Sequence, residues 1–342
     1  MTSSILLSVT LVLAVTVANI ATAKDTFAVF KSQDQGQTWR RSDAGMPAQS
    51  RINAFGSANG TLFAGTDSGI FASKDEALSW KPAEGAAISS GRVISLATLG
   101  RSVFGGADGK GLLESSDGGA SWALARSFPS PKVRCLLVHG GKIFAGTDDN
   151  GVFASEGGGQ AWTHLSAGLP PHAQIFALSA ARGRLFAGLY SQGLYAWDEP
   201  KQSWERIGPV KPLALTTVQD TLIAGHNPGG IYWSGDLGAT WSKGRADSPA
   251  AALLEFLHPG DSEELTAEAP VWELGSYDSL VFVGASAGIY SSENQGRTWK
   301  RARAGLPARS PGIAFLLKGE FVLAGIHIRG SDAQPSTAVP GR

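Results

Sequence analysis

Seven equivalent positions recur along the sequence, each directly before a short apolar segment, and four of them are basic. The members of this first column are Arg51, Arg92, Lys132, Gln174, Lys211, Pro270 and Pro311. A second column follows the next apolar segment and consists of Asp67, Asp108, Asp148, Tyr190, Asn227, Ser286 and His327. Its acids accompany three consecutive basic residues. The two columns predict either a rim of ordinary surface ion pairs or a polar pocket that binds an anionic or sugar-like ligand.

Other kinds of chemistry have less support. Asp67, Asp108 and Asp148 are candidates for glycoside hydrolysis, which needs paired carboxyl groups at a set separation. Residues 148–150 offer too few oxygen ligands for a calcium shell, and the six histidines have no ligand spacing. The single cysteine, Cys135, excludes a cysteine-built zinc site, and its apolar neighbours predict a buried strand position. We therefore expect no metal and no other cofactor.

Composition narrows the classes of protein further. Lys and Arg number 29, as do Asp and Glu, so the formal net charge is zero, which argues against a nucleic-acid-binding protein. A hydrophobic content of 43% is too high for a disordered chain. The 44 glycines and two methionines favour a fold with many tight turns over a helical bundle.

An eight-residue motif, Ser-x-Asp-x-Gly-x-x-Trp, marks the elements that must position these columns. Six copies lie at residues 32–39, 73–80, 115–122, 155–162, 234–241 and 292–299, and a degenerate seventh lies at 197–204. The Asp carboxylate accepts hydrogen bonds from its own turn, the Gly permits a positive φ, and the Trp begins the returning strand. We expect a structural role for Asp34, Trp39, Asp75, Trp80, Asp117, Trp122, Trp162, Asp236, Trp241, Asn294 and Trp299.

Three further short strands accompany each motif, so that one repeat holds four strands, a to d, in about 40 residues. This pattern predicts an all-β, seven-bladed propeller of four-stranded antiparallel blades. The N-terminal part begins with strand c at 26–30, and the C-terminal part ends with strands a and b at 312–317 and 321–325. We expect these complementary halves to pair in the first blade and to close the ring.

The order of the strands also sorts the loops. The d–a and b–c loops should lie at one end of the ring, and the a–b turns and the eight-residue motifs at the other. Several d–a loops read Gly-Leu-Pro or Gly-Met-Pro, at 45–47, 168–170 and 305–307, which indicates a structural role. The longer d–a loops make their end the expected binding face.

The eight-residue motif resembles the Asp-box, or BNR repeat, of sialidases, sortilin-type receptors, some glycoside hydrolases and photosystem II assembly-factor-like propellers. The resemblance to the assembly-factor-like propellers covers nearly the whole chain after the first residues. It implies an assembly scaffold that acts through protein contacts.

The resemblance to sialidases and to xyloglucanase-type hydrolases is less complete. Sialidases have six blades and an Arg-Ile-Pro signature, whereas Arg51-Ile52 is followed here by Asn53. Xyloglucanase-type enzymes hold their substrate between two such propellers. A carbohydrate-binding propeller would need exposed aromatic side chains, but we expect Trp197, Trp233 and Trp272 to pack between blades.

We therefore predict an exported, non-catalytic propeller that serves as a protein-interaction or assembly scaffold through its d–a/b–c loop face. The alternatives are a glycoside hydrolase and a carbohydrate-binding propeller. The expected partner is a protein or a glycan, with no nucleic acid, and the expected state is a monomer. The candidate binding residues are Arg51, Arg92, Lys132, Lys211, Asp67, Asp108, Asp148, Tyr190, Asn227 and His327.

The remaining segments complete the predicted organisation. Residues 1–23 have an apolar run and end in Ala-Thr-Ala, which predicts a signal peptide and a secreted or periplasmic protein, with a retained membrane anchor as the alternative. The propeller then spans 24–330, and 331–342 form a flexible tail. An insertion at 242–269, between blades 6 and 7, contains the sequence AAALLEFL and predicts a short helix. This helix would be a lid, a docking patch or a segment packed on the rim.

Overall fold

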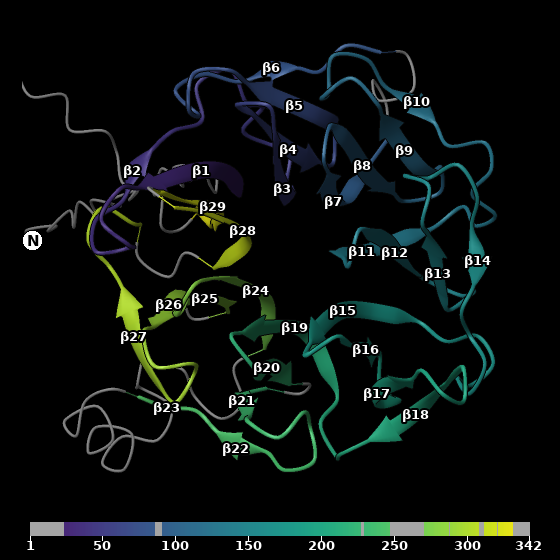
Figure 1. Cartoon of the computed structure of the whole chain (residues 1–342). Helices are drawn as coiled ribbons and strands as arrows, with labels where there is room; N and C mark the ends of the chain where they lie inside the picture. Colours follow the sequence, from purple (N-terminus) through teal and green to yellow (C-terminus); the bar gives the residue numbers. More distant parts are fainter. Residues whose placement is uncertain are drawn as a thin grey trace, which may run out of the picture.

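The computed structural model describes residues 24–85, 91–226, 229–246, 270–286, 288–307, 311–319 and 321–330. Seven sheets, antiparallel except for one added strand, are arranged in a ring around a common axis (Figure 1). We number the blades in chain order, so that blade 1 contains strands from both ends of the described chain. From the innermost strand outward, blade 1 has β28 (Gly312–Lys318), β29 (Phe321–Ile328), β1 (Thr26–Ser32) and β2 (Arg40–Arg41); blade 2 has β3 (Ile52–Ala58), β4 (Thr61–Thr66), β5 (Gly69–Ser73) and β6 (Lys81–Pro82); and blade 3 has β7 (Val93–Leu99), β8 (Ser102–Ala107), β9 (Gly111–Ser115) and β10 (Ala123–Leu124). Blade 4 has β11 (Val133–His139), β12 (Lys142–Thr147), β13 (Val152–Ser155) and β14 (Thr163–His164), and blade 5 has β15 (Ile175–Ala181), β16 (Arg184–Leu189), β17 (Gly193–Asp198) and β18 (Ser203–Ile207). Blade 6 has β19 (Pro212–Val218), β20 (Thr221–His226), β21 (Ile231–Ser234) and β22 (Ser242–Lys243), and blade 7 has β24 (Val271–Tyr277), β25 (Leu280–Ala285), β26 (Gly288–Ser292) and β27 (Thr298–Ala302).

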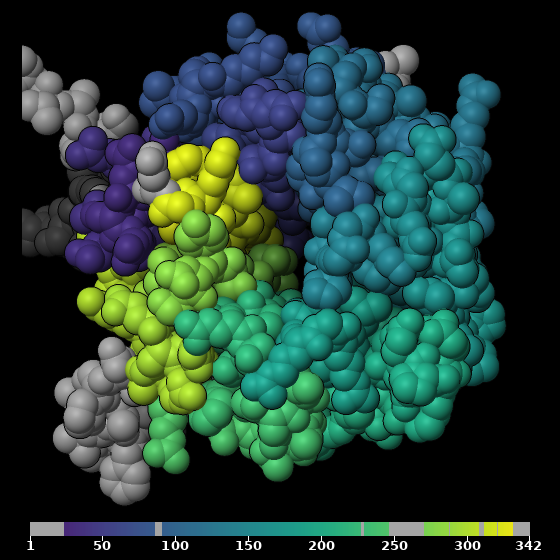
Figure 2. All heavy atoms as spheres, in the orientation of Figure 1, coloured from purple at the N-terminus to yellow at the C-terminus, as the bar shows by residue number. Residues whose placement is uncertain are grey.

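The two ends of the described chain share blade 1, as predicted from the sequence. Its strand order is β2-β1-β29-β28, and β1 pairs with β29 from Thr26 opposite Ile328 to Ser32 opposite Val322. The purple first strands and the yellow last strands are in contact in the space-filling view (Figure 2). The predicted fold class and ring closure are confirmed.

Close approach between neighbouring blades follows one rule around the whole ring. A glycine on each strand b faces the first residue of the next strand a, and these glycines are Gly65, Gly106, Gly146, Gly188, Gly225, Gly284 and Gly325. At Gly225, an added Cβ would lie 2.4 Å from Cγ1 of Val271. The seventh contact joins Gly325 to Ile52 and thereby packs blade 1 against blade 2. Side chains larger than glycine would therefore push neighbouring blades apart.

The repeated turn between strands c and d is held by its aspartate. In the first copy, Asp34 accepts hydrogen bonds from the amide of Thr38 at 2.8 Å and from its hydroxyl at 2.6 Å. The Ser32 hydroxyl also donates to Asp34, and it accepts from the amide of Gly36. These hydrogen bonds, those from Thr38 foremost, lower the pKa of Asp34 to about 2. The side chain is fully used within its own turn, which is a structural role.

The Gly-Leu-Pro and Gly-Met-Pro loops clasp the neighbouring blade. The amide of Trp39 donates to the carbonyl of Ala304, and an added Cβ on Gly305 would lie 1.9 Å from the Trp39 oxygen. Equivalent main-chain bonds join Trp80 to Ala44 and Trp204 to Ala167. Each loop therefore fixes the tryptophan of the next blade.

The start of the expected insertion adds a fifth strand to blade 7. After β22, the short strand β23 (Arg245–Ala246) pairs in parallel with β27. The helix expected from AAALLEFL, the signal segment 1–23 and the tail 331–342 lie outside the described residues. None of the described residues forms a helix long and apolar enough to cross a membrane.

Candidate functional site

A β-bulge interrupts the innermost strand of every blade at the same position. In blade 2, for example, Ile52 lies opposite Thr66 and Ala54 lies opposite Gly65, so Asn53 has no partner in the ladder. The residues skipped in this way are Asn53, Ile94, Arg134, Phe176, Leu213, Trp272 and Ile313. A bulge re-aims the side chain of its extra residue. All seven of these side chains line one cavity in the channel.

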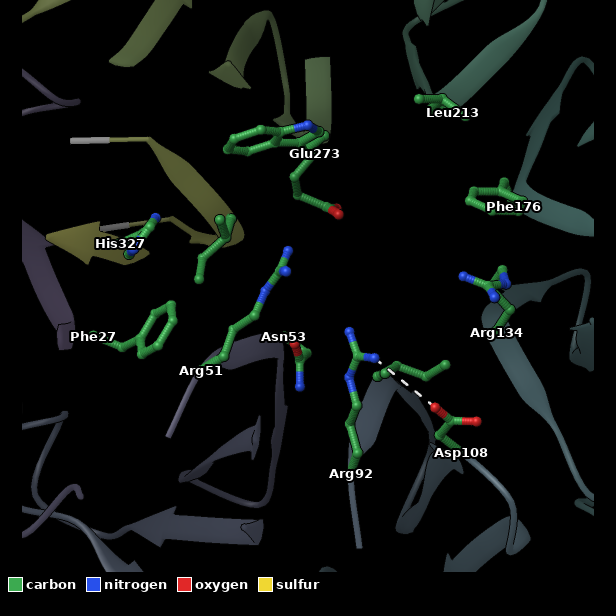
Figure 3. A pocket seen from close by; sticks show the side chains of 13 residues that line it. Phe27, Arg51, Asn53, Arg92, Asp108, Arg134, Phe176, Leu213, Glu273 and His327 are labelled. Carbon is green, nitrogen blue, oxygen red and sulfur yellow. Dashed lines mark ion pairs between the residues drawn. The ribbon is translucent and has the colours of Figure 1, made fainter. Parts of the chain in front are cut away.

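This cavity, which we call the central pocket, has a volume of about 540 Å³ and lies at the end of the channel formed by the d–a and b–c loops. Its wall consists of the seven bulged residues together with Phe27, Arg51, Arg92, Asp108, Glu273 and His327. Figure 3 shows the side chains of Arg51, Arg92, Arg134 and Glu273 extending towards the same space. The size suits a small molecule or a few residues of a peptide.

Blades 2, 3 and 4 give the pocket a polar side. Arg92 lies 3.2 Å from Asp67 and 3.8 Å from Asp108. In the next blade, Arg134 lies 2.6 Å from Asp148. Two of the three arginines in the wall are therefore compensated by carboxylates.

The third arginine, Arg51, differs from the other two. Among the described residues it forms no ion pair within 4.0 Å, and its buried Nε has no hydrogen-bond partner. Burial, together with the nearby charge of Arg92, lowers the pKa of Arg51 from its usual value. The charges of Asp67 and Glu273 oppose this shift. Arg51 is a half-buried side chain whose Nε lacks a hydrogen-bond partner, and an anionic ligand would supply an ion pair.

Aromatic and aliphatic side chains make up the other side of the pocket. Phe176, Leu213, Trp272 and Ile313 come from consecutive blades, and Phe27 lies beside them. The Arg134 guanidinium lies 4.2 Å from the Phe176 ring centre, where the two sides of the pocket meet. We expected Trp272 to pack between blades, but this is wrong: it lines the pocket and is 37% exposed. Val271 takes the buried position, and the bulge leaves Trp272 facing the channel.

One carboxyl group interrupts the apolar side. Glu273 follows its bulge, whereas the other six blades have Ala54, Ser95, Cys135, Ala177, Ala214 and Ala314 at this position. Burial raises the pKa of Glu273 to about 8, and the Arg51 charge opposes that rise. Glu273 is therefore the acid on the apolar side of the pocket, and it occupies a strand position that has small residues in the other six blades.

The residues expected from the two sequence columns take different places. The pocket wall includes Arg51, Arg92, Asp108 and His327. The carboxylates of Asp67 and Asp148 hold pocket arginines. The remaining described members lie behind or outside the wall: Lys132 beside Asp148, Tyr190 stacked on Phe176, and Lys211 with its amide on His226. Asn227 lies outside the described residues.

The two columns of residues identified in the sequence do not include most of the residues that line the central pocket. Arg134, Phe176, Trp272 and Glu273 stand two or three places after the first column, within the strands themselves. Aligning the seven strands a residue by residue would have shown one column of unlike side chains and one column with a single acid. Among the described residues, no group of three or more His, Cys, Asp or Glu side chains is arranged to hold a metal ion.

No family model matches the chain, and no curated protein matches it. Solved structures do resemble it. The structure of YCF48 bound to a D1 peptide has 16% identity and a TM-score of 0.60, covering 80% of this chain and 93% of that one. YCF48 from Cyanidioschyzon merolae has 15% identity and a TM-score of 0.60, covering 85% and 98%.

A glycoside hydrolase is similar as well. The GH74 xyloglucanase from Xanthomonas campestris has 16% identity and a TM-score of 0.63, covering 93% of this chain. The match covers 58% of that enzyme's own length. At these identities the comparisons establish a shared propeller fold.

Proposed function

We propose that this chain is a protein-interaction or assembly scaffold whose central pocket binds a peptide segment with an acidic group next to apolar side chains. In this proposal it is an Asp-box propeller that is similar to the photosystem II assembly-factor-like members. In this proposal the protein is exported, so that it is secreted or periplasmic, and it acts as a monomer without catalysis. The apolar run before Ala21-Thr22-Ala23 supports export.

The observation that carries the proposal is Arg51, which lines a pocket with one polar and one apolar side. Within the described ranges it has no ion pair, and its buried Nε has no hydrogen-bond partner. An acidic group of the peptide pairs with Arg51, while Arg92 and Arg134 add donors whose positions are fixed by their own carboxylates. Pre-positioned donors lose little side-chain freedom on binding.

The apolar side selects what lies next to the acidic group. Trp272 and Phe176 are rigid aromatic surfaces of the kind that dominate protein interfaces. An aliphatic or aromatic side chain of the peptide would cover them and exclude water. The likeness to a propeller solved with a bound peptide, YCF48 with the D1 peptide, supports a peptide as the kind of ligand.

A displayed library of random peptides, selected on the wild-type protein, tests this proposal. We expect enriched sequences that combine an acid with an aromatic or aliphatic neighbour. The double variant Arg51→Glu, Arg92→Glu should enrich none of them while melting like the wild type. Enrichment of the same sequences on both proteins would reject the pocket as the binding site.

A carbohydrate ligand is the second candidate, because Trp272 is exposed inside a pocket that also holds carboxylates. Sugars stack on such rings. A panel of aryl-glycosides and of neutral oligosaccharides tests binding and turnover. Turnover that is lost in Asp67→Asn or Asp148→Asn would replace the scaffold with a hydrolase.

A further inference from the structure

We propose that Glu273 controls whether the central pocket accepts an anionic group: the protonated carboxyl leaves Arg51 free to bind one, and the ionised carboxyl compensates Arg51 and excludes it. The inference deepens the proposed function, because it concerns the same pocket and names the charge of its ligand. It makes capture of a carboxylate a proton-linked event.

The balance of charge in the pocket is the first argument. Four cations lie in or beside the wall: Arg51, Arg92, Lys132 and Arg134. Their carboxylate partners are Asp67, Asp108 and Asp148, so that Glu273 would be the fourth when ionised. With Glu273 ionised this group of residues is neutral. With Glu273 protonated it has one positive charge, and Arg51 is the cation that forms no ion pair within 4.0 Å in the described part of the chain.

The position of Glu273 is the second argument. It occupies a site where six blades have small residues, so its carboxyl takes up space in the channel that the others leave empty. Figure 3 shows the Glu273 carboxyl and the Arg51 guanidinium extending into the same part of the pocket. A ligand carboxylate that reaches Arg51 therefore meets Glu273 as well. Two ionised carboxyl groups in one small site repel each other, which couples ligand binding to protonation.

Other groups that titrate nearby must be separated from Glu273. Several strands pack against β24. Two of them, β25 and β28, have no charged side chain at this end of the channel, whereas β19 is preceded by Lys211 and β20 ends in His226. Burial, together with the nearby charge of Lys211, lowers the pKa of His226. Across the pocket, Arg92 and Arg134 stay charged, and Cys135 has a pKa raised by burial to about 12. Asp108 stands beside Arg92, and His327 pairs with Asp25 at 2.9 Å. The Glu273→Gln control must therefore separate the effect of Glu273 from those of Lys211, His226 and His327.

Acetate is the probe for this inference, since it is a single carboxylate and stays ionised from pH 6.5 to pH 9.5. Its binding is followed by the ¹³Cζ NMR signal of Arg51, which is assigned by its absence in Arg51→Lys. If acetate binds only to the protonated form, its affinity should fall about 30-fold between these pH values. Glu273→Gln, which keeps the shape and cannot ionise, should lose less than about 3-fold.

Each outcome decides the inference. An affinity that is independent of pH in the wild type, an equal loss in Glu273→Gln, or no acetate binding at pH 6.5 would overturn it. The pKa of the Glu273 carboxyl can be measured in the wild-type protein by NMR with ¹³C-labelled glutamate, so this test does not depend on the folding of a variant. A pKa near the ordinary value of glutamate would also overturn the inference. If acetate behaves as expected and no peptide is ever enriched, the peptide function fails while this inference stands.

Discussion

Two layers of the propeller use adjacent residues of the same innermost strands: the contacts between neighbouring blades, and the wall of the central pocket. The residue types repeat in the first layer and vary in the second. Between the blades, the same glycine contact repeats seven times, from Gly65 against Val93 to Gly325 against Ile52. The next residue of each strand a lines the pocket, and its type differs from blade to blade. Asn53, Arg134 and Trp272, for example, hold equivalent positions. The repeated glycine contacts hold the blades together in a closed ring, and the varied residues at the bulges give the pocket its polar and apolar sides.

Changes in the repeated layer should affect stability, whereas changes in the pocket wall should affect binding. A substitution in the repeated layer strains a packed contact that every blade needs. A substitution in the wall alters a side chain that faces open space, where it touches few neighbours. We therefore expect substitutions in the two layers to have different effects in stability and binding measurements.

The largest effect should come from removing half of blade 1. Deletion of residues 312–342 removes β28 and β29, exposes the edge of β1 and opens the ring. We expect loss of cooperative thermal unfolding, measured by near-ultraviolet circular dichroism. Deletion of 331–342, which removes no described residue, serves as the control. A 312–342 deletion that melts as sharply as the full chain would disprove closure through blade 1.

A single residue in the repeated layer comes next. Gly225→Val places atoms where Val271 already lies, with the first of them 2.4 Å from its Cγ1. We expect a loss of about 2–4 kcal/mol in the free energy of unfolding, measured by urea titration. Gly235→Ala, whose added Cβ would meet nothing within 4 Å, is the control and should change stability by less than about 0.5 kcal/mol.

The pocket wall should show the opposite behaviour. Trp272→Ala removes an aromatic surface from the pocket and should weaken a selected peptide about 5–20-fold in fluorescence anisotropy, with little change in melting temperature. Tyr277→Ala is a matched control, because Tyr277 is a 53% exposed aromatic residue at the other end of the same strand. Equal effects of the two variants on affinity would remove Trp272 from the site.

Glu273 is the place where a pocket residue should affect stability. Its pKa of about 8 in the folded chain lies above the ordinary 4.5, so the folded protein retains a proton that the unfolded chain releases. The wild type should therefore lose stability relative to Glu273→Gln as the pH rises from about 4.5 to about 8, and the difference should stay constant above that. We expect Glu273→Gln to be about 1–3 kcal/mol more stable at pH 9 and equal at pH 4. A constant difference across this range would contradict the buried carboxyl.

The smallest effect should come from the exposed turns. The pKa of Asp34 is lowered to about 2, so the stability that its carboxylate provides is present above pH 3.8 and is lost as the pH falls towards 2. Asp34→Ala should destabilise the protein at pH 7, and the difference from the wild type should vanish near pH 2. A difference that persists at that pH would show that the charge of Asp34 is unimportant.

The sequence predicted what repeats. Tryptophans such as Trp39 and Trp80 marked the blades, and the strands at 26–30 and 321–325 predicted the closure that β1 and β29 form. The Asp34 turn was predictable because its hydrogen bonds are local. Each of these features depends on residues close in the sequence or on a pattern seen several times.

The pocket wall was less predictable, because a bulge adds one residue to each strand a and changes which side chains face the channel. Lys132 was expected at the mouth, whereas Arg134 occupies the wall and Lys132 is 54% exposed beside Asp148. Trp272 was expected between blades for the same reason. Glu273 stands out as an exception only when the seven strands a are aligned residue by residue, because the other six blades have small residues at its position.

The most direct test of the peptide site compares two charge reversals on one strand entry, Arg134→Glu and Lys132→Glu. Both replace a cation near Asp148, but only Arg134 lines the pocket. For a selected acidic peptide, measured by anisotropy at one salt concentration, we predict a loss of at least about 30-fold in Arg134→Glu and less than about 3-fold in Lys132→Glu. Equal losses in the two variants, or full affinity in Arg134→Glu, would contradict binding in the central pocket.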